Sequence, residues 1–354
     1  MFVNARFTAQ ALTGVQRFAT EITRALPGVW PEGRALPLLL APRGAGEVPG
    51  GLGRRIVGPF GGHLWEQTVL PAHARGGVLV NLGNTAPLLA RRQIVVIHDA
   101  GVFATPEAYT ARFRAWYGFV QRRLARGAAR IASVSMFARD DIARAFDLDP
   151  AEIAVLGEGA DHLQRIRPDR AVLDRHGLLP DRYVLAVGSL AAHKNLQSLG
   201  ATSAMLARRG MALVVTGGID ASVFGGASGV LPDGARFVGR VDDAELLALY
   251  EAAACFVFPS RYEGFGLPAV EAMAAACPVV AARAGALPEI CGAAAVYCDP
   301  ASAPGIADAV AAVLDDGELA QGLRERGRAR AACMTWARAA ALLRDEILRC
   351  ERGE

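Results

Sequence analysis

The sequence predicts an α/β protein made of two doubly wound, Rossmann-like domains in tandem. Two observations support this fold class. Short, nearly continuous apolar runs alternate with helical stretches, which is typical of parallel strands covered on both faces. These runs also form two series, separated by a polar stretch over residues 159–182.

The first series is expected to supply one sheet and the second series the other. The predicted strands of the first series are Leu36–Leu40, Gly77–Asn81, Ile94–His98, Arg130–Val134 and Ile153–Leu156. Those of the second are Tyr183–Val187, Leu213–Thr216, Ala235–Val238, Cys255–Phe258 and Val279–Ala282. We therefore place the domains at residues 1–170 and 171–334, with a linker near 165–180 and a final helix in 335–354.

Composition excludes several classes of protein. Hydrophobic residues make up 52% of the chain and charged residues 21%, which indicates a globular protein with substantial cores. No apolar run approaches the roughly 20 residues that span a bilayer, and no signal-type leader is recognisable. The six cysteines form no CxxC pair, so we expect no zinc site and no disulfide framework, as in a cytoplasmic protein.

Basic charge is concentrated in the first part of the chain. Residues 1–130 hold 16 Arg and 6 acidic residues, a net charge of +10. Six of these Arg lie in 111–130, a basic amphipathic segment without acids. Either this helix lies on the inner face of an anionic plasma membrane, or it is packed in the domain with solvated arginines. No nucleic-acid-binding motif is present, so we expect no nucleic acid partner.

Most of the chemistry is expected in residues 255–282, CFVFPSRYEGFGLPAVEAMAAACPVVAA. A strand ends at Pro259, a glycine-containing loop follows, and Pro268 suits the first turn of a helix. We expect the N–H groups of Gly264, Phe265 and Gly266 to point out at the start of this helix, where anions are favoured. Carboxylates nearby accept hydrogen bonds from sugar hydroxyls, so the segment suits a sugar diphosphate.

Glu263 and Glu271, in EGFGLPAVE, form a motif that resembles the E-x7-E signature of retaining, nucleotide-sugar-dependent glycosyltransferases of family 4, the glycosyltransferase group 1 domain. The resemblance extends over nearly the whole chain, and its opening is similar to mannosyltransferases of bacterial surface polysaccharide assembly. Further segments that match are TGVQRFATEI, VVIHDAGVFATPEAY, ASVSMFARDDIARAF, VGSLAAHKNL, VGRVDDAELLALYEAA and ALPEICGAAAVYCDP. The resemblance implies the GT-B architecture, with an acceptor-binding first domain, a donor-binding second domain and a last helix that crosses back to the first.

The resemblance also implies roles for individual residues. Lys194 would hold the donor diphosphate and act in catalysis with Glu263 and His98. The family often has an Arg where this chain has Ser189, which leaves Lys194, the one Lys among 38 basic residues, as the principal cation. The implied donor-binding residues are Gly14, Ser189, Lys194, Val241, Glu263, Gly264, Phe265, Gly266, Leu267 and Glu271, and the implied acceptor-binding residues are Asp99 and Arg139.

Other interpretations of these residues stay open at this point. Glu263 could cap the helix, Glu271 could lie on a solvated helix face, and His98 could be a supporting residue bonded to backbone. No cofactor and no metal are expected, because neither HExxH-like spacing nor a DxD-like motif after a strand occurs.

The expected reaction is retaining transfer of a hexose, with mannose from GDP-mannose as the first choice and UDP-sugars as the other. The expected acceptor is a saccharide or a polyprenyl-diphosphate-linked saccharide. The alternatives are a sugar-nucleotide epimerase or a non-catalytic scaffold on the same fold.

Overall fold

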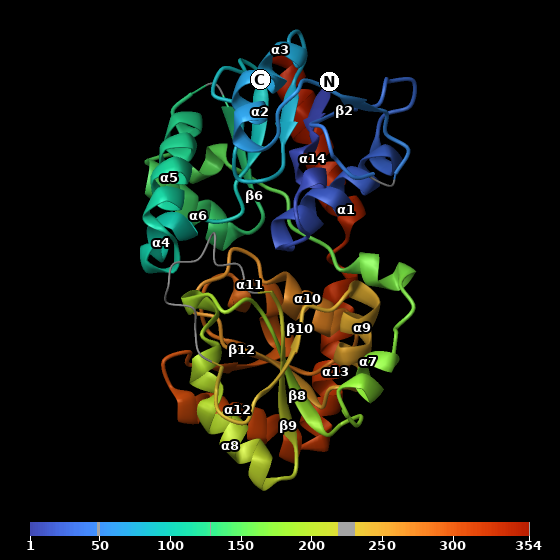
Figure 1. Ribbon diagram of the computed structural model, residues 1–354, viewed down its shortest axis with the longest axis vertical. Coiled ribbons are helices and arrows are strands. Elements are labelled where there is room, and N and C mark those ends of the chain that lie inside the picture. Colours follow the sequence, from blue (N-terminus) through green and yellow to red (C-terminus); the bar gives the residue numbers. More distant parts are fainter. Residues whose placement is uncertain (48–49, 128, 219–230, 354) are drawn as a thin grey trace. The chain divides into compact units, whose positions relative to one another are not determined.

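The chain folds into two compact units, and each is described by itself (Figure 1). The computed structural model describes residues 1–47, 50–127, 129–218 and 231–353. The first unit comprises Met1–Phe103, Arg114–Glu158 and Trp336–Glu354, and the second comprises Ala104–Phe113 and Gly159–Thr335.

The first unit is built on a parallel sheet, seven-stranded within the described residues. Successive strands extend the sheet in one direction from β1 and then in the other from β4, so the order reverses between these two neighbours. Such a switch point opens a crevice at the carboxyl ends of the strands. The spatial order is β3 (Arg54–Ile56), β2 (Leu38–Ala41), β1 (Phe2–Asn4), β4 (Leu79–Asn81), β5 (Gln93–Val96), β6 (Ala129–Ser133) and β7 (Ala154–Val155).

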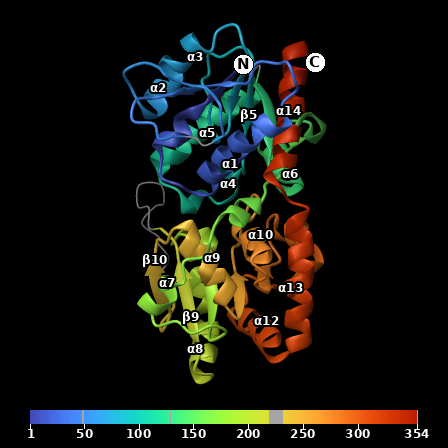
Figure 2. The same ribbon diagram turned by 90° about the vertical axis from the view of Figure 1, so that its right-hand side faces the viewer.

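Helices follow most of these strands, and the last helix of the chain joins them. Figures 1 and 2 show α14 beside α1. The rings of Phe18 on α1 and Trp336 on α14 lie 6.0 Å apart, and both are almost fully buried. The elements are η1 (Ala5–Ala9), α1 (Gly14–Val29), α2 (Gly62–Thr68), α3 (Leu70–His73), α4 (Gly101–Ala104), α5 (Ala111–Ala125), α6 (Met136–Phe146), η3 (Pro150–Glu152) and α14 (Trp336–Arg352). The short element η2 (Pro106–Ala108) belongs to the second unit.

Helix α5 carries most of the basic segment, and its apolar stripe packs inside the protein. Val120 and Leu124 are buried in a core cluster with Ile97. Phe119 is 53% exposed, on the side of the helix that also carries exposed arginines. The interpretation of a packed helix therefore holds for Val120 and Leu124, while residue 128 of the segment lies outside the described residues. Across the described ranges, no helix combines the length and apolar character that a membrane crossing requires.

The second unit is also built on a parallel sheet, with six strands in its described part. Its order reverses between β8 and β11, which places a second switch point there. The spatial order is β10 (Arg236–Gly239), β9 (Ala212–Thr216), β8 (Tyr183–Val187), β11 (Cys255–Phe258), β12 (Val279–Ala282) and β13 (Ala295–Cys298). The helical elements are η4 (Asp161–Arg165), α7 (Ala171–Arg175), η5 (Ala192–Lys194), η6 (Leu196–Leu199), α8 (Gly200–Arg208), α9 (Asp243–Ala252), α10 (Leu267–Ala274), α11 (Leu287–Cys291), η7 (Gly292–Ala294), α12 (Ala303–Asp315) and α13 (Gly317–Ala332).

Both faces of the second sheet are covered. In β11, Cys255 and Val257 join a buried cluster that includes Val310 of α12. Phe256, which alternates with them, packs its ring edge-on against Tyr250 of α9, with centroids 5.5 Å apart. Because successive strand residues point to opposite faces, the two contacts mark two layers of helices. The predicted fold class, two doubly wound Rossmann-like domains, is confirmed.

Candidate active site

The switch point of the second sheet brings together Lys194 and Glu263. Lys194 lies in η5, in the loop that follows β8, and Glu263 lies in the loop that follows β11. Its Nζ donates to Oε1 of Glu263 at 2.7 Å, with side chains 20% and 11% exposed. The ammonium also lies 5.7 Å from the ring centroid of Phe258, the last residue of β11. Two residues 69 positions apart thus form one partly buried, charge-assisted contact.

Glycines and one asparagine fix the Lys194 loop. A Cβ on Gly188 would lie 3.5 Å from Cγ of Lys194, so the lysine stem packs directly on this glycine. Gly217, at the end of β9, has φ +152, and a Cβ there would lie 2.0 Å from the Gly188 oxygen. Asn195 is 1% exposed, and its Nδ2 donates to the carbonyl oxygens of Pro259 (3.0 Å) and Pro300 (2.8 Å). The loop is therefore tied to the ends of neighbouring strands.

The Glu263 loop is fixed by Gly285. This glycine has φ +58, and a Cβ there would lie 2.7 Å from both the backbone N and O of Glu263. The Ala286 N–H donates to the Glu263 carbonyl at 3.0 Å. The two loops are also joined, because the Arg261 N–H donates to the His193 carbonyl at 2.8 Å. The backbone conformation is therefore restricted at both Lys194 and Glu263.

Helix α10 starts where the sequence predicted, after a glycine in the left-handed region. Gly266 is its N-cap, with φ 95, and a Cβ there would lie 2.6 Å from Cδ2 of Leu287. Gly264, Phe265 and Leu267 are buried. The outward direction of the N–H groups at this helix start stays a prediction. No side chain caps the helix start. The first N–H groups of a helix and its dipole give this end partial positive charge.

Glu271 lies on the second turn of α10 and is 7% exposed, so the interpretation of a solvated helix face is wrong. Its Oε2 accepts from the Tyr250 hydroxyl at 3.4 Å, and its Oε1 lies 3.3 Å from Nε2 of His162. Burial, followed by the Glu271 charge, raises the pKa of Tyr250 well above its usual value. The hydroxyl therefore stays protonated and can donate to the carboxylate.

Ser189 and Val241 follow strands β8 and β10 of this sheet. Ser189 follows Gly188 after β8 and is half-buried. Val241 is half-buried and precedes Asp242, the N-cap of α9, which forms a capping box with Glu245. Their contacts with a donor stay a prediction.

In the first unit, His98 follows β5 by two residues and is 5% exposed. Its Nε2 lies 3.0 Å from the Leu82 carbonyl oxygen, and its Nδ1 lies 3.5 Å from Oε1 of Glu158. The ring packs edge-on against Phe18, with centroids 4.7 Å apart. The contact with a backbone carbonyl is the one expected of a supporting histidine, while contact with a sugar stays a prediction.

The other predicted residues of the first unit are spread along its elements. Asp99 accepts from the Gly101 N–H at 2.8 Å, at the start of α4. Arg139 on α6 pairs with its neighbour Asp140 at 2.7 Å. Gly14 is the first residue of α1, is exposed, and a Cβ there would meet nothing within 4 Å. The fold itself therefore leaves space beside Gly14.

Sequence reasoning missed the residues that contact Glu271 and anchor the loop of Lys194. His162 and Tyr250 flank Glu271, and Asn195 anchors the loop of Lys194. His193 stacks on Tyr109, with centroids 6.3 Å apart, and burial followed by the Lys194 charge lowers its pKa to about 4. His193 and Asn195 flank Lys194 in the sequence, but nothing in the spacing marks His162 or Tyr250.

Among residues 1–47, 50–127, 129–218 and 231–353, no group of three or more His, Cys, Asp or Glu side chains is placed to hold a metal ion.

Comparisons with known proteins all find glycosyltransferases. A family model for glycosyl transferases group 1 matches residues 174–330. The chain is 31% identical over 261 residues to O-antigen chain mannosyltransferase B of Escherichia coli. The aligned residues make up 71% of this chain and 68% of the relative. It is 27% identical over 235 residues to O-antigen chain mannosyltransferase RfbU of Salmonella typhimurium, 63% of each. The matched stretches thus span roughly two thirds of both relatives.

A solved structure extends the likeness in fold over the whole chain. Sucrose-phosphate synthase from Thermosynechococcus elongatus superposes with a TM-score of 0.74 at 18% identity, covering 100% of this chain and 99% of that one. At this identity the likeness concerns the fold alone. The match to the Escherichia coli relative, together with the family model over the second unit, shows that this chain belongs to the glycosyl transferases group 1 family and is a nucleotide-sugar-dependent glycosyltransferase.

Proposed function

We propose that the protein transfers mannose from GDP-mannose, with retention at the anomeric carbon, to a saccharide or polyprenyl-diphosphate-linked saccharide during bacterial surface polysaccharide assembly. The choice of mannose is supported by the two relatives, which are named as O-antigen chain mannosyltransferases. The observation that carries the site assignment is the Lys194–Glu263 pair at the switch point of the second sheet. Ligands of doubly wound sheets bind at such points.

In this proposal, the donor separates the two charges of the pair. The Lys194 ammonium turns to the diphosphate, for which a compact point charge is well suited. Glu263, held by its backbone, then accepts hydrogen bonds from hydroxyls of the sugar. Gly264, Phe265, Gly266 and Leu267 line the start of α10, whose dipole favours the same phosphates. Glu271 receives the ribose hydroxyls, Ser189 and Val241 border the donor, and Gly14 is also assigned to donor binding.

Catalysis then consists of stabilising negative charge on the departing nucleoside diphosphate. Lys194 and the start of α10 supply this stabilisation without a metal ion. We assign no covalent nucleophile: the acceptor hydroxyl attacks on the face from which the diphosphate leaves, and its proton passes to the departing diphosphate. His98, Asp99 and Arg139 are assigned to the reacting sugar and the acceptor.

The first experiment is a thermal-shift series with GDP, UDP and ADP, because a ligand that binds the native state raises its Tm. We expect GDP to give the largest shift. Incubation with GDP-mannose should then yield product only when an acceptor is present, and NMR of the new linkage should show the α-anomer. A shift by UDP alone would refute the GDP assignment. Interconversion of nucleotide sugars without acceptor would instead identify an epimerase, and binding without turnover a scaffold.

The acceptor assignment includes a peripheral place at the cytoplasmic face of the membrane. It is supported by the net charge of +10 in residues 1–130 and by the exposed arginines of α5. We expect co-sedimentation with vesicles rich in phosphatidylglycerol at low salt, and loss of binding when Arg122 and Arg123 are changed to Gln. Protein that stays in the supernatant at low salt would exclude this location.

A further inference from the structure

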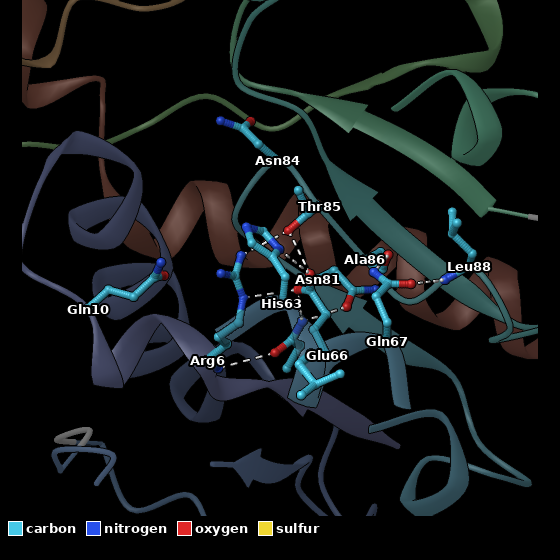
Figure 3. A network of polar contacts seen from close by, with 12 residues as sticks. Arg6, Gln10, His63, Glu66, Gln67, Asn81, Asn84, Thr85, Ala86 and Leu88 are labelled. Carbon is cyan, nitrogen blue, oxygen red and sulfur yellow. Dashed lines mark hydrogen bonds and ion pairs between the residues drawn. The ribbon is translucent and has the colours of Figure 1, made fainter. Parts of the chain in front are cut away.

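The switch point of the first sheet carries a polar cluster whose side chains are not among the site residues that the family resemblance implies. Figure 3 shows it at the carboxyl ends of β1 and β4. Arg6 lies in η1 directly after β1, Thr85 follows β4, and α2 supplies His63 and Glu66. The cluster thus occupies in the first sheet the position that Lys194 and Glu263 occupy in the second.

Glu66 is the centre of this cluster and is 1% exposed. Its Oε1 accepts from Asn4 Nδ2 at 2.9 Å and from Arg6 Nε at 3.2 Å. Its Oε2 accepts from the Thr85 hydroxyl at 2.9 Å and lies 3.2 Å from His63 Nδ1. Burial alone raises the pKa of this carboxyl group, but His63, Arg6 and Asn4 outweigh burial and hold it below its usual value. The carboxylate is therefore ionised and can only accept hydrogen bonds.

This carboxylate determines the tautomer of His63. Because an ionised carboxylate only accepts, the neutral ring must carry its proton on Nδ1, which leaves a lone pair on Nε2. The ring is held edge-on by Trp116 and Tyr117, with centroids 5.5 and 5.7 Å away, and its side chain is 32% exposed. Within the described residues, Nε2 has no hydrogen-bond partner. A fixed, accessible acceptor atom results.

Stability alone does not account for this arrangement. Arg6 is 7% exposed and donates from Nη2 to Thr85 at 2.9 Å, so two opposite charges are buried together. Withdrawing such a pair from water is costly, and well-packed apolar side chains are often as stable. The Arg6–Glu66 pair instead fixes the carboxylate of Glu66, which holds the His63 ring in one orientation and one tautomer. Carboxylate-oriented histidines of this kind serve binding and proton handling at functional sites.

We propose that Nε2 of His63 accepts a hydrogen bond from a hydroxyl of the acceptor saccharide, with Glu66 as the positioning residue that fixes the ring. The inference rests on the proposed function, because it deepens the assignment of the acceptor to the first unit. The ligand class follows from the chemistry: a neutral lone-pair acceptor selects a hydroxyl group, and the adjacent aromatic side chains Trp116 and Tyr117 offer apolar surface to a sugar ring.

The test uses two substitutions that separate the two ring nitrogens. His63→Asn keeps an amide that can donate to Glu66 but removes the acceptor at the Nε2 position. His63→Gln places an amide oxygen near the Nε2 position. With GDP-mannose as donor and p-nitrophenyl α-mannoside as acceptor probe, we expect His63→Asn to raise the acceptor KM about tenfold, the worth of one ordinary hydrogen bond. The donor KM should stay unchanged, and His63→Gln should raise the acceptor KM less. His73→Asn, at an exposed histidine at the end of α3, is the matched control.

An NMR measurement reads the same nitrogen without turnover. Long-range proton–nitrogen spectra of the whole chain, assigned with His63→Asn, should show Nε2 unprotonated, and the probe should shift this signal. An unchanged acceptor KM in His63→Asn, or an Nε2 that carries the proton or ignores the probe, overturns the inference. The donor assignment is judged separately: a Tm raised by GDP leaves it standing, whereas no response to any nucleoside diphosphate overturns the proposed function itself.

Discussion

The substitution Lys194→Arg tests whether the position of one charge matters, since it keeps the charge and changes its shape. In the structure, the ammonium is placed by a 2.7 Å contact with Glu263 and by a stem that packs on Gly188. A guanidinium is planar, spreads its charge over three nitrogens and reaches further, so it cannot reproduce this point contact. It would still pair with Glu263, as a fork facing the carboxylate, and would hold that pair more firmly.

The expected loss of activity follows from the hydrogen bond between Lys194 and the donor diphosphate, which the guanidinium would misplace. A hydrogen bond to a charged group contributes about 1.5–3 kcal/mol. Since each ~1.4 kcal/mol is a factor of ten in rate, kcat/KM for the donor should fall about 10- to 150-fold. The fold should stay intact, because the side chain is partly exposed and a cation still faces Glu263.

The assay is the initial rate of nucleoside diphosphate release in the presence of acceptor, with Tm measured in parallel. Arg209→Lys is the matched control: it exchanges the same two residue types at the exposed Arg209–Asp315 pair in the same unit, where Nη2 and Oδ2 are 2.9 Å apart. This control should have wild-type kinetics. If Lys194→Arg keeps more than half of the wild-type kcat/KM, the assignment of Lys194 as a precisely placed phosphate ligand is refuted.

Three further predictions concern the surroundings of this pair. Tyr250→Phe removes a hydrogen-bond donor to Glu271, so the donor KM should rise about 3- to 10-fold with kcat little changed, and an unaltered donor KM would contradict this support role. Gly285→Ala should lower both Tm and activity, because a Cβ would lie 2.7 Å from the Glu263 backbone at a positive φ; wild-type Tm and rate would count against the loop argument. The pKa of His193 is lowered from 6.5 to about 4, so the unfolded chain binds a proton between these values that the folded chain does not. Stability should therefore rise with pH from about 4 to about 6.5, by up to about 3 kcal/mol. In the His193→Asn variant, Tm should depend less on pH in that window. A dependence equal to that of the wild type would contradict the lowered pKa of His193.

The sequence predicted a strand correctly where a continuous apolar run marks it. Apolar runs located the strands at Tyr183–Val187, Cys255–Phe258 and Val279–Ala282 with the bounds that the structure has. Strand β3, Arg54–Ile56, was not predicted, because it is a three-residue edge strand whose residues are all exposed and carry no apolar pattern. Strand β1 is equally short, Phe2–Asn4, and no periodicity can be read from three residues.

The same limit applies to the sites. Lys194 and Glu263 could be named from the motifs, but the sequence did not show that they contact each other. The His63 cluster could not be found, because Arg6 and Thr85 are 79 positions apart and meet only through the pairing of β1 with β4. Its residues carry no spacing that marks them, since the cluster is a product of sheet order and not of local sequence.

Lys194 has a practical consequence that follows from the rarity of its residue type. Apart from the α-amino group of the chain, its side chain is the one primary amine in the sequence, and it is partly accessible beside Glu263. Amine-acylating reagents therefore have a single side chain to modify, and peptide mass mapping separates that modification from one at the α-amino group. The extent of labelling with increasing nucleotide becomes a titration of the site by mass spectrometry, with neither a mutation nor an identified acceptor needed.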